Sequence, residues 1–422
     1  MIPNIKLGAS QPGAVVAFVL GALFFGYAFI QRVSPSVMTA ELMSEFAVGA
    51  TALGSLSAFY FYTYASIQLP VGMLTDRFGP RKLMSFAAGL CAFASLGFAL
   101  SDSIISASIG RALIGGTVAF AFVGTLSIAS YWFSARRYAL LAGLLQSVGM
   151  CGAIFGQAPL RHLVESVGWR GSMMVLAGAA ILLSILLFLL VPRRSADQLG
   201  VSGQSKILEG LKLIAGNKQT WICALIGFGM ASIMLGFGGL WSVPWLTTVH
   251  GYSTVEAAGI TSMIFVGWAI FSPIVGWLSD KIGRRNPIMM MGSLLCLTAF
   301  ASLIFYTPDN TAMIMWLIFL TGAGGSAMTA GFSSVRELNH PSFSSTALGL
   351  MNMFIVGAGA VMQPLIGWLL DKHWDGVLAN GARVYSDQAF TTALTSLLVV
   401  TFMAFIATFL LRETYCKQLD FE

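Results

Sequence analysis

Two arginines stand inside long apolar stretches of the sequence, and they are the first residues that suggest chemistry. Arg32 lies in GALFFGYAFIQRVSPSVM (21–38), and Arg111 lies in the apolar stretch 105–130. A charged side chain at the centre of a bilayer costs about 2.5–3.5 kcal/mol on insertion scales. The guanidinium group offers five donors in a fixed fork that matches a carboxylate. A carboxylate in a water-filled cavity would therefore account for Arg32.

Each arginine also has a competing structural interpretation. Arg32 could extend its side chain to the outer headgroups, because long basic side chains reach the interface from within a span. Arg111, seven residues into its span, could be tied to backbone carbonyls or to its loop. The sequence offers neither arginine a carboxylate in its own span, since the 17 acidic residues fall in loops or at span ends.

Other polar side chains recur inside the apolar stretches. Tyr60, Tyr64 and Gln68 follow one another at four-residue intervals and so share one helix face. Trp241 is surrounded by Gly238, Gly239 and Pro244, a pattern typical of a discontinuous helix near a binding site. With the amides of two further stretches, the candidate binding residues are Arg32, Tyr60, Tyr64, Gln68, Arg111, Gln146, Gln157, Trp241, Asn352 and Gln363.

These polar residues have structural alternatives as well. Tyrosines and tryptophans gather in belts at membrane interfaces, which would explain Tyr60 and Tyr64, and equally Trp241 and Trp245. Amide side chains hydrogen-bond between neighbouring helices, which would explain Gln146, Gln157, Asn352 and Gln363 without any solute.

The composition places these residues in a membrane. The chain has 422 residues, of which 57% are hydrophobic and 9% are charged. Soluble domains carry about 25% charged residues, so this chain cannot cover a surface that faces water. The apolar runs are about 20 residues long, which predicts helices, whereas barrel strands would be about 10 residues and would alternate in polarity.

Twelve apolar runs predict twelve transmembrane helices, all α in class. The runs are 14–38, 50–72, 83–100, 105–130, 138–160, 171–192, 220–242, 255–276, 288–306, 312–333, 346–369 and 389–411. The longest polar gap predicts an N-terminal six-helix bundle over 1–192, a cytoplasmic linker over 193–219 and a C-terminal six-helix bundle over 220–422.

The basic residues predict the orientation of the chain. With both termini in the cytoplasm, the basic residues left on the outer side are Arg161, Arg170, Lys372 and Arg383. An excess of lysine and arginine in cytoplasmic loops is the usual pattern of helical membrane proteins. We therefore attribute the formal net charge of +6 to basic residues in cytoplasmic loops, and we expect no nucleic-acid partner.

Two loops repeat one motif at an offset of 204 residues. GMLTDRFGPRK (72–82) follows the second span, and GWLSDKIGRRN (276–286) follows the eighth. The glycines suit a tight turn, and the aspartate suits a neighbouring helix N-terminus, which carries partial positive charge. A second internal similarity relates residues 143–157 to residues 349–363. The chain is therefore predicted to consist of two parallel repeats. The motif residues are Gly72, Asp76, Arg77, Gly79, Arg81, Gly276, Asp280, Gly283 and Arg284.

With these motifs the chain resembles the major facilitator superfamily over essentially its whole length. Further carriers of the resemblance are GRALIGG (Gly110–Gly116), WFSARRYALLAG (Trp132–Gly143) and GWR (Gly168–Arg170). The resemblance implies two six-helix bundles, a central solute site and alternating access by rocking. It also implies that Asp76 and Asp280 act as conformational latches, and it places the protein in a bacterial inner membrane.

The first four spans look most like the anion:cation symporter branch of that superfamily. The matching text is RVSPSVMTAELMSEF (32–46) and SAFYFYTYASIQLPVGMLTDRFG (57–79). Members of that branch typically carry a glutamate in span four, a few residues after the arginine, which serves proton coupling. Val118 stands about where that acid would fall, so a proton would have to travel on the solute or on a span-end acid such as Glu337.

The leading interpretation is a secondary active transporter that imports a small organic acid, amino acid or short peptide, with a proton as the candidate coupling ion. An exporter of the same fold and a membrane sensor without transport are the alternatives. The sequence has no nucleotide-binding loop, nucleophile–base pattern or metal cluster. We therefore expect no enzymatic activity and no cofactor. The expected partners are an anionic or zwitterionic solute and the lipid bilayer, and the expected assembly is a monomer.

Overall fold

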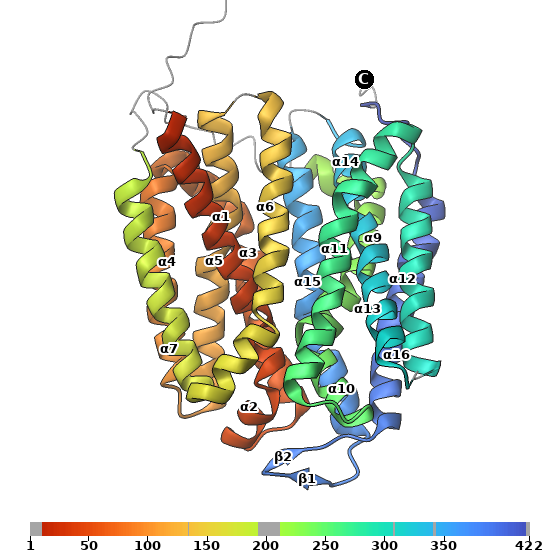
Figure 1. The fold of residues 1–422 in the computed structure, drawn as a ribbon. Coiled ribbons are helices and arrows are strands. Elements are labelled where there is room, and N and C mark those ends of the chain that lie inside the picture. The colour runs from red at the N-terminus through yellow and green to blue at the C-terminus, as the bar shows by residue number, and fades with distance from the viewer. Residues whose placement is uncertain (1–10, 134, 193–211, 307–308, 341–342, 419–422) are drawn as a thin grey trace, which may run out of the picture.

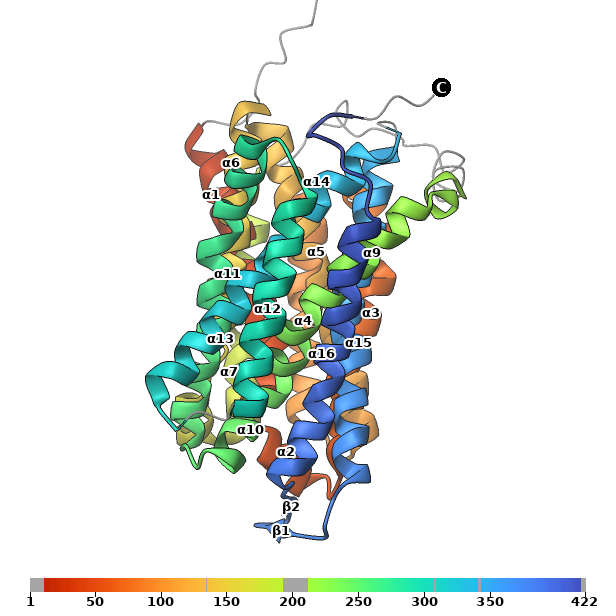
Figure 2. The ribbon, with the colours of Figure 1, turned by 90° about the vertical axis from the view of Figure 1, so that its right-hand side faces the viewer.

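Long apolar segments form helices in this chain because a helix satisfies its backbone hydrogen bonds within the segment, as a bilayer requires. The computed structural model describes residues 11–133, 135–192, 212–306, 309–340 and 343–418. Within them the helices lie side by side in a bundle, and the described chain begins and ends at the same end of that bundle (Figures 1 and 2).

The first half of the chain supplies one side of the bundle in Figure 1. Its elements are α1 (Gln11–Val33), the 3-10 turn η1 (Ser34–Val37), α2 (Thr39–Glu45), α3 (Ala50–Phe78), α4 (Pro80–Ala99), α5 (Ile104–Trp132), α6 (Ala135–Phe155) and α7 (Ala158–Leu190). Gly168 has a positive φ of 74° and kinks α7.

The second half supplies the other side, with a short antiparallel hairpin in which Leu378 pairs with Arg383. Its elements are α9 (Lys218–Ser232), the π-helix η3 (Ile233–Trp241), α10 (Ser242–Val249), α11 (Thr254–Ile282), α12 (Asn286–Tyr306), α13 (Thr311–Gly325), the 3-10 turn η4 (Ser326–Met328), α14 (Thr329–Glu337), α15 (Ser344–Lys372), β1 (Leu378–Ala379), β2 (Ala382–Arg383) and α16 (Asp387–Leu410).

These helices correspond to the twelve apolar runs of the sequence. Ten of the described helices are long and apolar enough to cross a membrane, and α2 with α3 makes an eleventh as a bent pair. The remaining run is the shorter apolar helix Leu141–Phe155 within α6, which packs against α1. The expected linker 193–219 lies mostly outside the described residues, and α9 begins at Lys218.

The two halves are clasped at the end of the bundle that carries β1 and β2, here called the hairpin end (Figure 1). Asp371, at the end of α15, accepts hydrogen bonds from the backbone N–H groups of Ala50 (3.1 Å) and Thr51 (2.8 Å) at the start of α3. The Thr51 hydroxyl (2.6 Å), Arg383 (3.1 Å) and the Tyr385 hydroxyl (2.6 Å) also donate to it. A carboxylate of one half thus caps a helix of the other half.

The helix backbones of α3 and α15 approach closely just behind this clasp. A Cβ atom on Gly54 would lie 2.5 Å from the carbonyl oxygen of Gln363. Farther along the same two helices, the Tyr62 hydroxyl donates to the Ala360 carbonyl at 3.0 Å. The small residue at Gly54 therefore lets the helices touch, as is usual where lipid supplies no hydrophobic drive.

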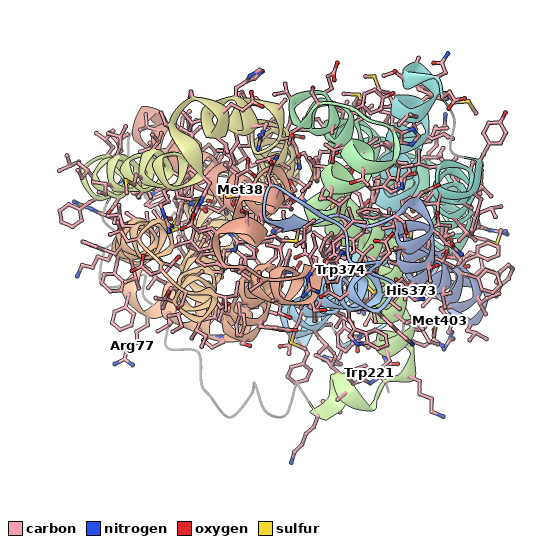
Figure 3. All side chains as sticks on the ribbon, turned by 90° about the horizontal axis from the view of Figure 1, so that it is seen from below. Met38, Arg77, Trp221, His373, Trp374 and Met403 are labelled. Atoms are coloured by element: carbon pink, nitrogen blue, oxygen red, sulfur yellow. The ribbon has the colours of Figure 1, made fainter. Side chains whose placement is uncertain are left out.

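The repeated loop motifs lie at the opposite end, here called the loop-motif end. Gly79 (φ 77°) and Gly283 (φ 71°) adopt positive φ angles and make the turns after α3 and α11. Gly72 and Gly276, in contrast, lie within those helices, so the expected tight turn belongs only to the later glycine of each motif. The side chain of Asp76 lies outside the described residues. Arg77 is exposed and points away from the bundle (Figure 3), and Arg81 donates to the Phe188 carbonyl at 2.7 Å.

The second loop motif is held by a buried arginine that the sequence analysis did not select. Arg285 pairs with Asp280 (2.6 Å) and with Glu337 (2.8 Å), whereas the selected Arg284 is exposed. Burial lowers the pKa of the Arg285 guanidinium, but its hydrogen bonds to Glu337 and Asp280 outweigh burial and place that pKa above its usual value. Among the described residues, Asp280 binds Arg285.

The N-terminus of α12 beside this motif is occupied by an acid of the C-terminal segment. Glu413 accepts the backbone N–H groups of Arg285 and Asn286, both at 2.9 Å. The neighbouring Thr414 hydroxyl donates to Glu337 at 2.5 Å. The C-terminal segment is therefore part of the packed structure at the loop-motif end.

We expect Asp371→Asn to loosen the hairpin end, because an amide loses the charge that stabilises the α3 N-terminus and pairs with Arg383. Spin labels on α2 and on the β1–β2 loop, in a variant with Cys151 and Cys416 replaced, would report longer distances. Asp375→Asn is the matched control, since Asp375 is an exposed acid four residues away. Identical distance distributions in all three proteins would show that Asp371 does not hold the two halves together at the hairpin end.

We expect Glu337→Gln to lower the free energy of unfolding by about 3 kcal/mol, because Arg285 stays buried with only its exposed partner Asp280. Asp280→Asn should cost less than about 1 kcal/mol, since that carboxylate is 70% exposed. Thermal unfolding in one detergent compares the two variants. Equal losses would show that burial does not decide the strength of this network.

Candidate functional site

Arg32 lies at the end of α1 among aromatic rings. Its guanidinium carbon is 4.2 Å from the centre of the Phe29 ring, 5.0 Å from that of Tyr64 and 5.7 Å from that of Tyr60. The residue is only 6% exposed, so the side chain does not reach out to headgroups. Its place in the last turn of α1 also suits the negative end of the helix dipole.

Arg111 is tied to the point where α1 ends. The carbonyl of Gln31 has no helical partner, because the residue four positions later is Pro35, which lacks an N–H group. Arg111 Nη1 donates to that carbonyl at 2.7 Å, and the Ser34 hydroxyl donates to it at 3.0 Å. This contact is the backbone tie that the sequence analysis considered for Arg111.

The two tyrosines of α3 connect both arginines. Tyr60 and Tyr64 stack with ring centres 5.9 Å apart and an angle of 13° between their planes. The guanidinium carbon of Arg111 lies 5.1 Å from the centre of the Tyr60 ring, and the Tyr60 hydroxyl donates to the Ala28 carbonyl at 3.1 Å. Both tyrosines are buried, so they do not belong to an interfacial belt. Phe29, Arg32, Tyr60, Tyr64 and Arg111 are called the arginine–tyrosine cluster below.

Several buried polar atoms in and near this cluster have no hydrogen-bond partner in the described part of the chain. They are Arg32 Nε, Arg111 Nε and Nη2, Gln31 Oε1 and Gln68 Nε2. A buried polar group without a partner costs about 1–3 kcal/mol, and more when it is charged. No described acid pairs with either arginine. The cluster therefore has the donors and the charge of an anion site.

Gln31 is a polar residue that the sequence analysis missed. It is fully buried, and its amide nitrogen donates to the Tyr27 hydroxyl (2.6 Å) and to the Ser95 hydroxyl (3.0 Å). These contacts join α1 to α4. The sequence signal for Gln31 was its position directly before the arginine of an apolar span.

Three other selected residues form a separate group near the hairpin end. Gln157 donates to the Gly238 carbonyl at 3.4 Å and to the Ser36 hydroxyl at 3.2 Å. Gln363 donates to the Leu235 carbonyl at 2.8 Å and accepts a bond from Trp241 at 3.1 Å through its own carbonyl. These contacts fit the interpretation of amides that join helices. Trp241 and Trp245 are buried, so they form no interfacial belt.

The glycine-rich part of span seven is a π-helix and not a break. The carbonyls of Leu235 and Gly238, which bind the two glutamines, belong to this segment, Ile233–Trp241. Gln146 in α6 and Asn352 in α15 are half-buried, and no hydrogen bond joins either of them to the arginine–tyrosine cluster among the described residues.

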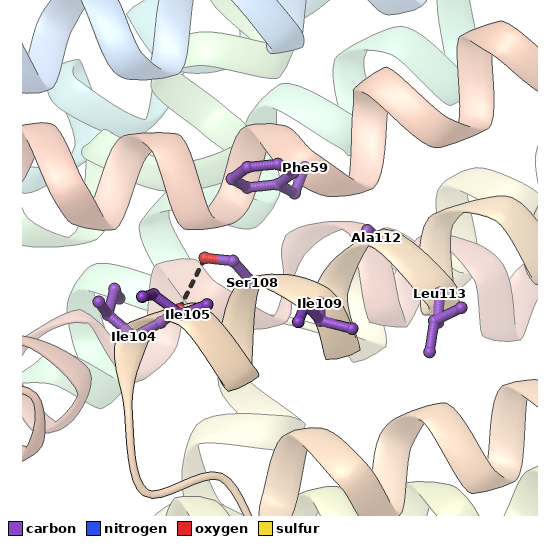
Figure 4. Close-up of a pocket in the computed structure, with 7 residues that line it drawn as sticks. All are labelled: Phe59, Ile104, Ile105, Ser108, Ile109, Ala112 and Leu113. Atoms are coloured by element: carbon purple, nitrogen blue, oxygen red, sulfur yellow. Dashed lines mark hydrogen bonds between the residues drawn. The ribbon is translucent and has the colours of Figure 1, made fainter.

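An apolar groove lies between α3 and α5 (Figure 4). It has a volume of about 290 Å³, and its lining is Phe59, Ile104, Ile105, Ser108, Ile109, Ala112 and Leu113. The Ser108 hydroxyl is turned to the Ile104 carbonyl at 2.7 Å, which leaves a hydrocarbon wall. Ile105 and Ile109 are exposed on this flank, so the groove suits a lipid chain rather than a polar solute.

The chain matches a family model and has similar proteins of known name. The model of the Major Facilitator Superfamily matches residues 16–364. The D-galactonate transporter of Escherichia coli O6:H1 is 24% identical, with 94% of this chain and 98% of the relative covered. The probable galactarate/D-glucarate transporter GudP of Escherichia coli K12 is 23% identical, with 92% of each chain covered.

Among solved structures, a bacterial homolog of the human lysosomal transporter Spinster, in an inward-facing and unoccupied conformation, matches with a TM-score of 0.79. The two sequences are 16% identical, and the match covers 96% of this chain and 98% of the other. This likeness concerns the fold. Together with the repeated loop motifs and the family match over most of its length, it leads to one conclusion: this chain belongs to the major facilitator superfamily and is a non-enzymatic secondary transporter.

Proposed function

We propose that this transporter moves a small carboxylate-bearing organic solute by alternating access and that the arginine–tyrosine cluster binds the carboxylate. The observation that carries the proposal is Arg32, a nearly buried cation with an unpartnered Nε and no described acid beside it. A guanidinium in this situation is suited to a bidentate anion, since two parallel bonds satisfy donors and charge together. Two similar proteins are named as transporters of sugar acids, which supports the same class of solute.

Aromatic rings hold the guanidinium of Arg32 at the proposed site. Phe29 and Tyr64 lie against the guanidinium of Arg32, where their ring faces attract the cation and hold it in one orientation. Arg111 holds the end of α1 in place through the Gln31 carbonyl, so the direction of Arg32 is set before the solute arrives. A preorganised cation saves the cost of ordering a flexible side chain at binding.

Alternating access would act through the two ends of the bundle. The clasp of Asp371 on α3 closes the hairpin end between the halves, so a second state would open there and close at the loop-motif end. The latch role of Asp76 and Asp280 in that second state remains a prediction. The distribution of basic residues favours an orientation with the loop-motif end in the cytoplasm of a bacterial inner membrane.

Coupled uptake is the proposed direction of transport. Val118 is an apolar, fully buried residue at the position expected for a coupling acid. Glu337 accepts hydrogen bonds from Arg285 and Thr414 at the loop-motif end. A proton would therefore travel on the solute itself.

Proteoliposome uptake of labelled carboxylates and amino acids, with a pH gradient and a membrane potential imposed separately, tests the coupling. Uptake driven by either gradient supports symport. Stimulation by internal solute in the absence of both gradients would instead establish exchange, and it would overturn the proposed direction. Glu337→Gln should leave any proton dependence unchanged.

We expect Arg32→Lys to bind the solute weakly and Arg32→Ala not to bind it, with normal amounts of both proteins in the membrane. Lysine keeps the charge but lacks the fork, and alanine lacks both. Calorimetry or thermal shift on purified protein measures the affinity, and Arg412→Ala, at an exposed arginine, is the control. Equal affinity in wild type and Arg32→Ala would disprove the anion site, whereas full function of Arg32→Lys would show that a point charge suffices.

A further inference from the structure

We propose that a second groove, at the loop-motif end of the second half, binds an anionic membrane phospholipid through its phosphate headgroup. The groove has a volume of about 680 Å³, and ligand pockets usually measure about 300–1,000 Å³. It shares no residue with the arginine–tyrosine cluster. The proposal is therefore independent of the solute and is tested separately from it. This groove is called the headgroup groove below.

The headgroup groove lies where four membrane helices reach the end of the bundle. The helices α9 and α15 begin beside it, while α14 and α16 end beside it. Trp221, in the first turn of α9, is exposed, and its indole N–H donates to the Ala215 carbonyl at 2.8 Å. Exposed tryptophans gather at the level of the lipid headgroups. The groove is thus expected at the depth of a phospholipid headgroup.

One wall of the groove extends sideways from the bundle. Residues 212–216 form a short helical segment before Asn217, and Figure 2 shows it pointing away from the other helices at the loop-motif end. Lys212 and Leu213 on this segment are both exposed. A lysine next to an exposed leucine suits a segment that lies in the interface, where the charge meets headgroups and the leucine meets acyl chains.

Hydrogen bonds between its walls hold the groove in shape. The Asn217 amide donates to the Leu338 carbonyl at 2.8 Å, which joins the start of α9 to the end of α14. The Gln219 amide oxygen accepts the backbone N–H of Arg412 at 2.8 Å, which joins α9 to the C-terminal segment. A groove with fixed walls loses little conformational freedom when a ligand enters.

The groove presents positive charge without an opposing acid. Arg412 lines it, and neither a hydrogen bond nor an ion pair engages the Arg412 guanidinium within the described ranges. Lys212 and Lys218 are exposed beside the same wall. The nearby acids have other partners, since Glu337 binds Arg285 and Glu413 caps α12. A guanidinium with free donors is suited to the two oxygens of a phosphate group.

The remaining lining favours a lipid over a free phosphate ion. Leu213, Leu338 and Phe343 also line the groove and give it a hydrocarbon surface next to Arg412. An anionic phospholipid supplies a phosphate for the arginine and an acyl chain for these three side chains. A free phosphate would leave the apolar surface in contact with water, which is unfavourable.

Photo-cross-linking of the full-length protein in nanodiscs tests the proposal. The nanodiscs contain equal amounts of anionic phosphatidylglycerol and zwitterionic phosphatidylcholine. Phe343→p-benzoylphenylalanine places the reactive group in the groove, and mass spectrometry identifies the captured lipid. We expect phosphatidylglycerol to exceed phosphatidylcholine about fivefold, because one basic side chain near a membrane surface attracts an anionic lipid to about that extent.

Phe86→p-benzoylphenylalanine is the matched control, since Phe86 is an exposed phenylalanine of α4 outside the groove. It should capture the two lipids in the ratio in which the nanodisc contains them. Equal capture of both lipids at Phe343 would overturn the proposal. Cross-links from Phe343 to residues 193–211 in place of lipid would overturn it as well, because the chain itself would then fill the groove.

Arg412→Gln, combined with the cross-linker at Phe343, tests the origin of the preference. The backbone N–H of residue 412 can still donate to Gln219, so the wall is retained while the charge is lost. The excess of phosphatidylglycerol should then disappear. Arg77→Gln removes an exposed arginine that points away from the bundle at the same end (Figure 3), and it should leave the excess unchanged. An undiminished excess in Arg412→Gln would overturn the headgroup site.

Inorganic phosphate distinguishes a lipid from a free ion. An excess of phosphate should reduce the capture of phosphatidylglycerol no more than potassium chloride of the same ionic strength does, because the ion lacks an acyl chain. A selective loss of capture in phosphate would assign the groove to a free anion and overturn the lipid. None of these readouts depends on solute binding, so they leave the proposed function to its own test.

Discussion

One unpaired carbonyl organises the centre of the first half. Pro35 cannot donate to the Gln31 carbonyl, and the Ser34 hydroxyl and Arg111 of α5 donate to it instead. The bond from Arg111 connects the end of α1 to the first third of α5. Arg32 follows Gln31 in the last turn of α1, and the charge of Arg111 lies beside Tyr60, so this bond joins the two arginine-bearing helices of the cluster.

Acidic side chains at helix N-termini perform different tasks at the two ends of the bundle. At the hairpin end, Asp371 of the second half caps α3 of the first half and so joins the halves. At the loop-motif end, Glu413 caps α12 within the second half alone. The same interaction therefore resists separation of the halves at one end and only stabilises one half at the other.

The buried amides illustrate why a list of polar residues in apolar spans does not define a binding site. From the sequence, Gln157 and Gln363 are candidates for lining the transport pathway. In the structure, both donate their amide N–H groups to carbonyls of the π-helix in span seven. A carbonyl oxygen has two lone pairs, so a carbonyl within a helix can accept a second hydrogen bond from a glutamine of a neighbouring helix. Gln31 was overlooked beside Arg32, although it is the more deeply buried of the two.

The sequence by itself determined that the chain forms a bundle of membrane helices, because apolar length is a local property of the chain. The repeated loop motif likewise predicts two repeats. The sequence also indicated that Arg32, Tyr60 and Tyr64 belong together, since helical spacing places the tyrosines on one face. Only the tertiary structure decided which polar groups meet. Arg285 rather than Arg284 binds the acids of the second loop motif, Asp371 contacts α3 although it lies 320 residues away, and Arg111 donates to the Gln31 carbonyl. Hydrogen bonds and ion pairs act over a few ångströms, so their partners depend on how the helices pack, and residue type and spacing along the chain do not specify that packing.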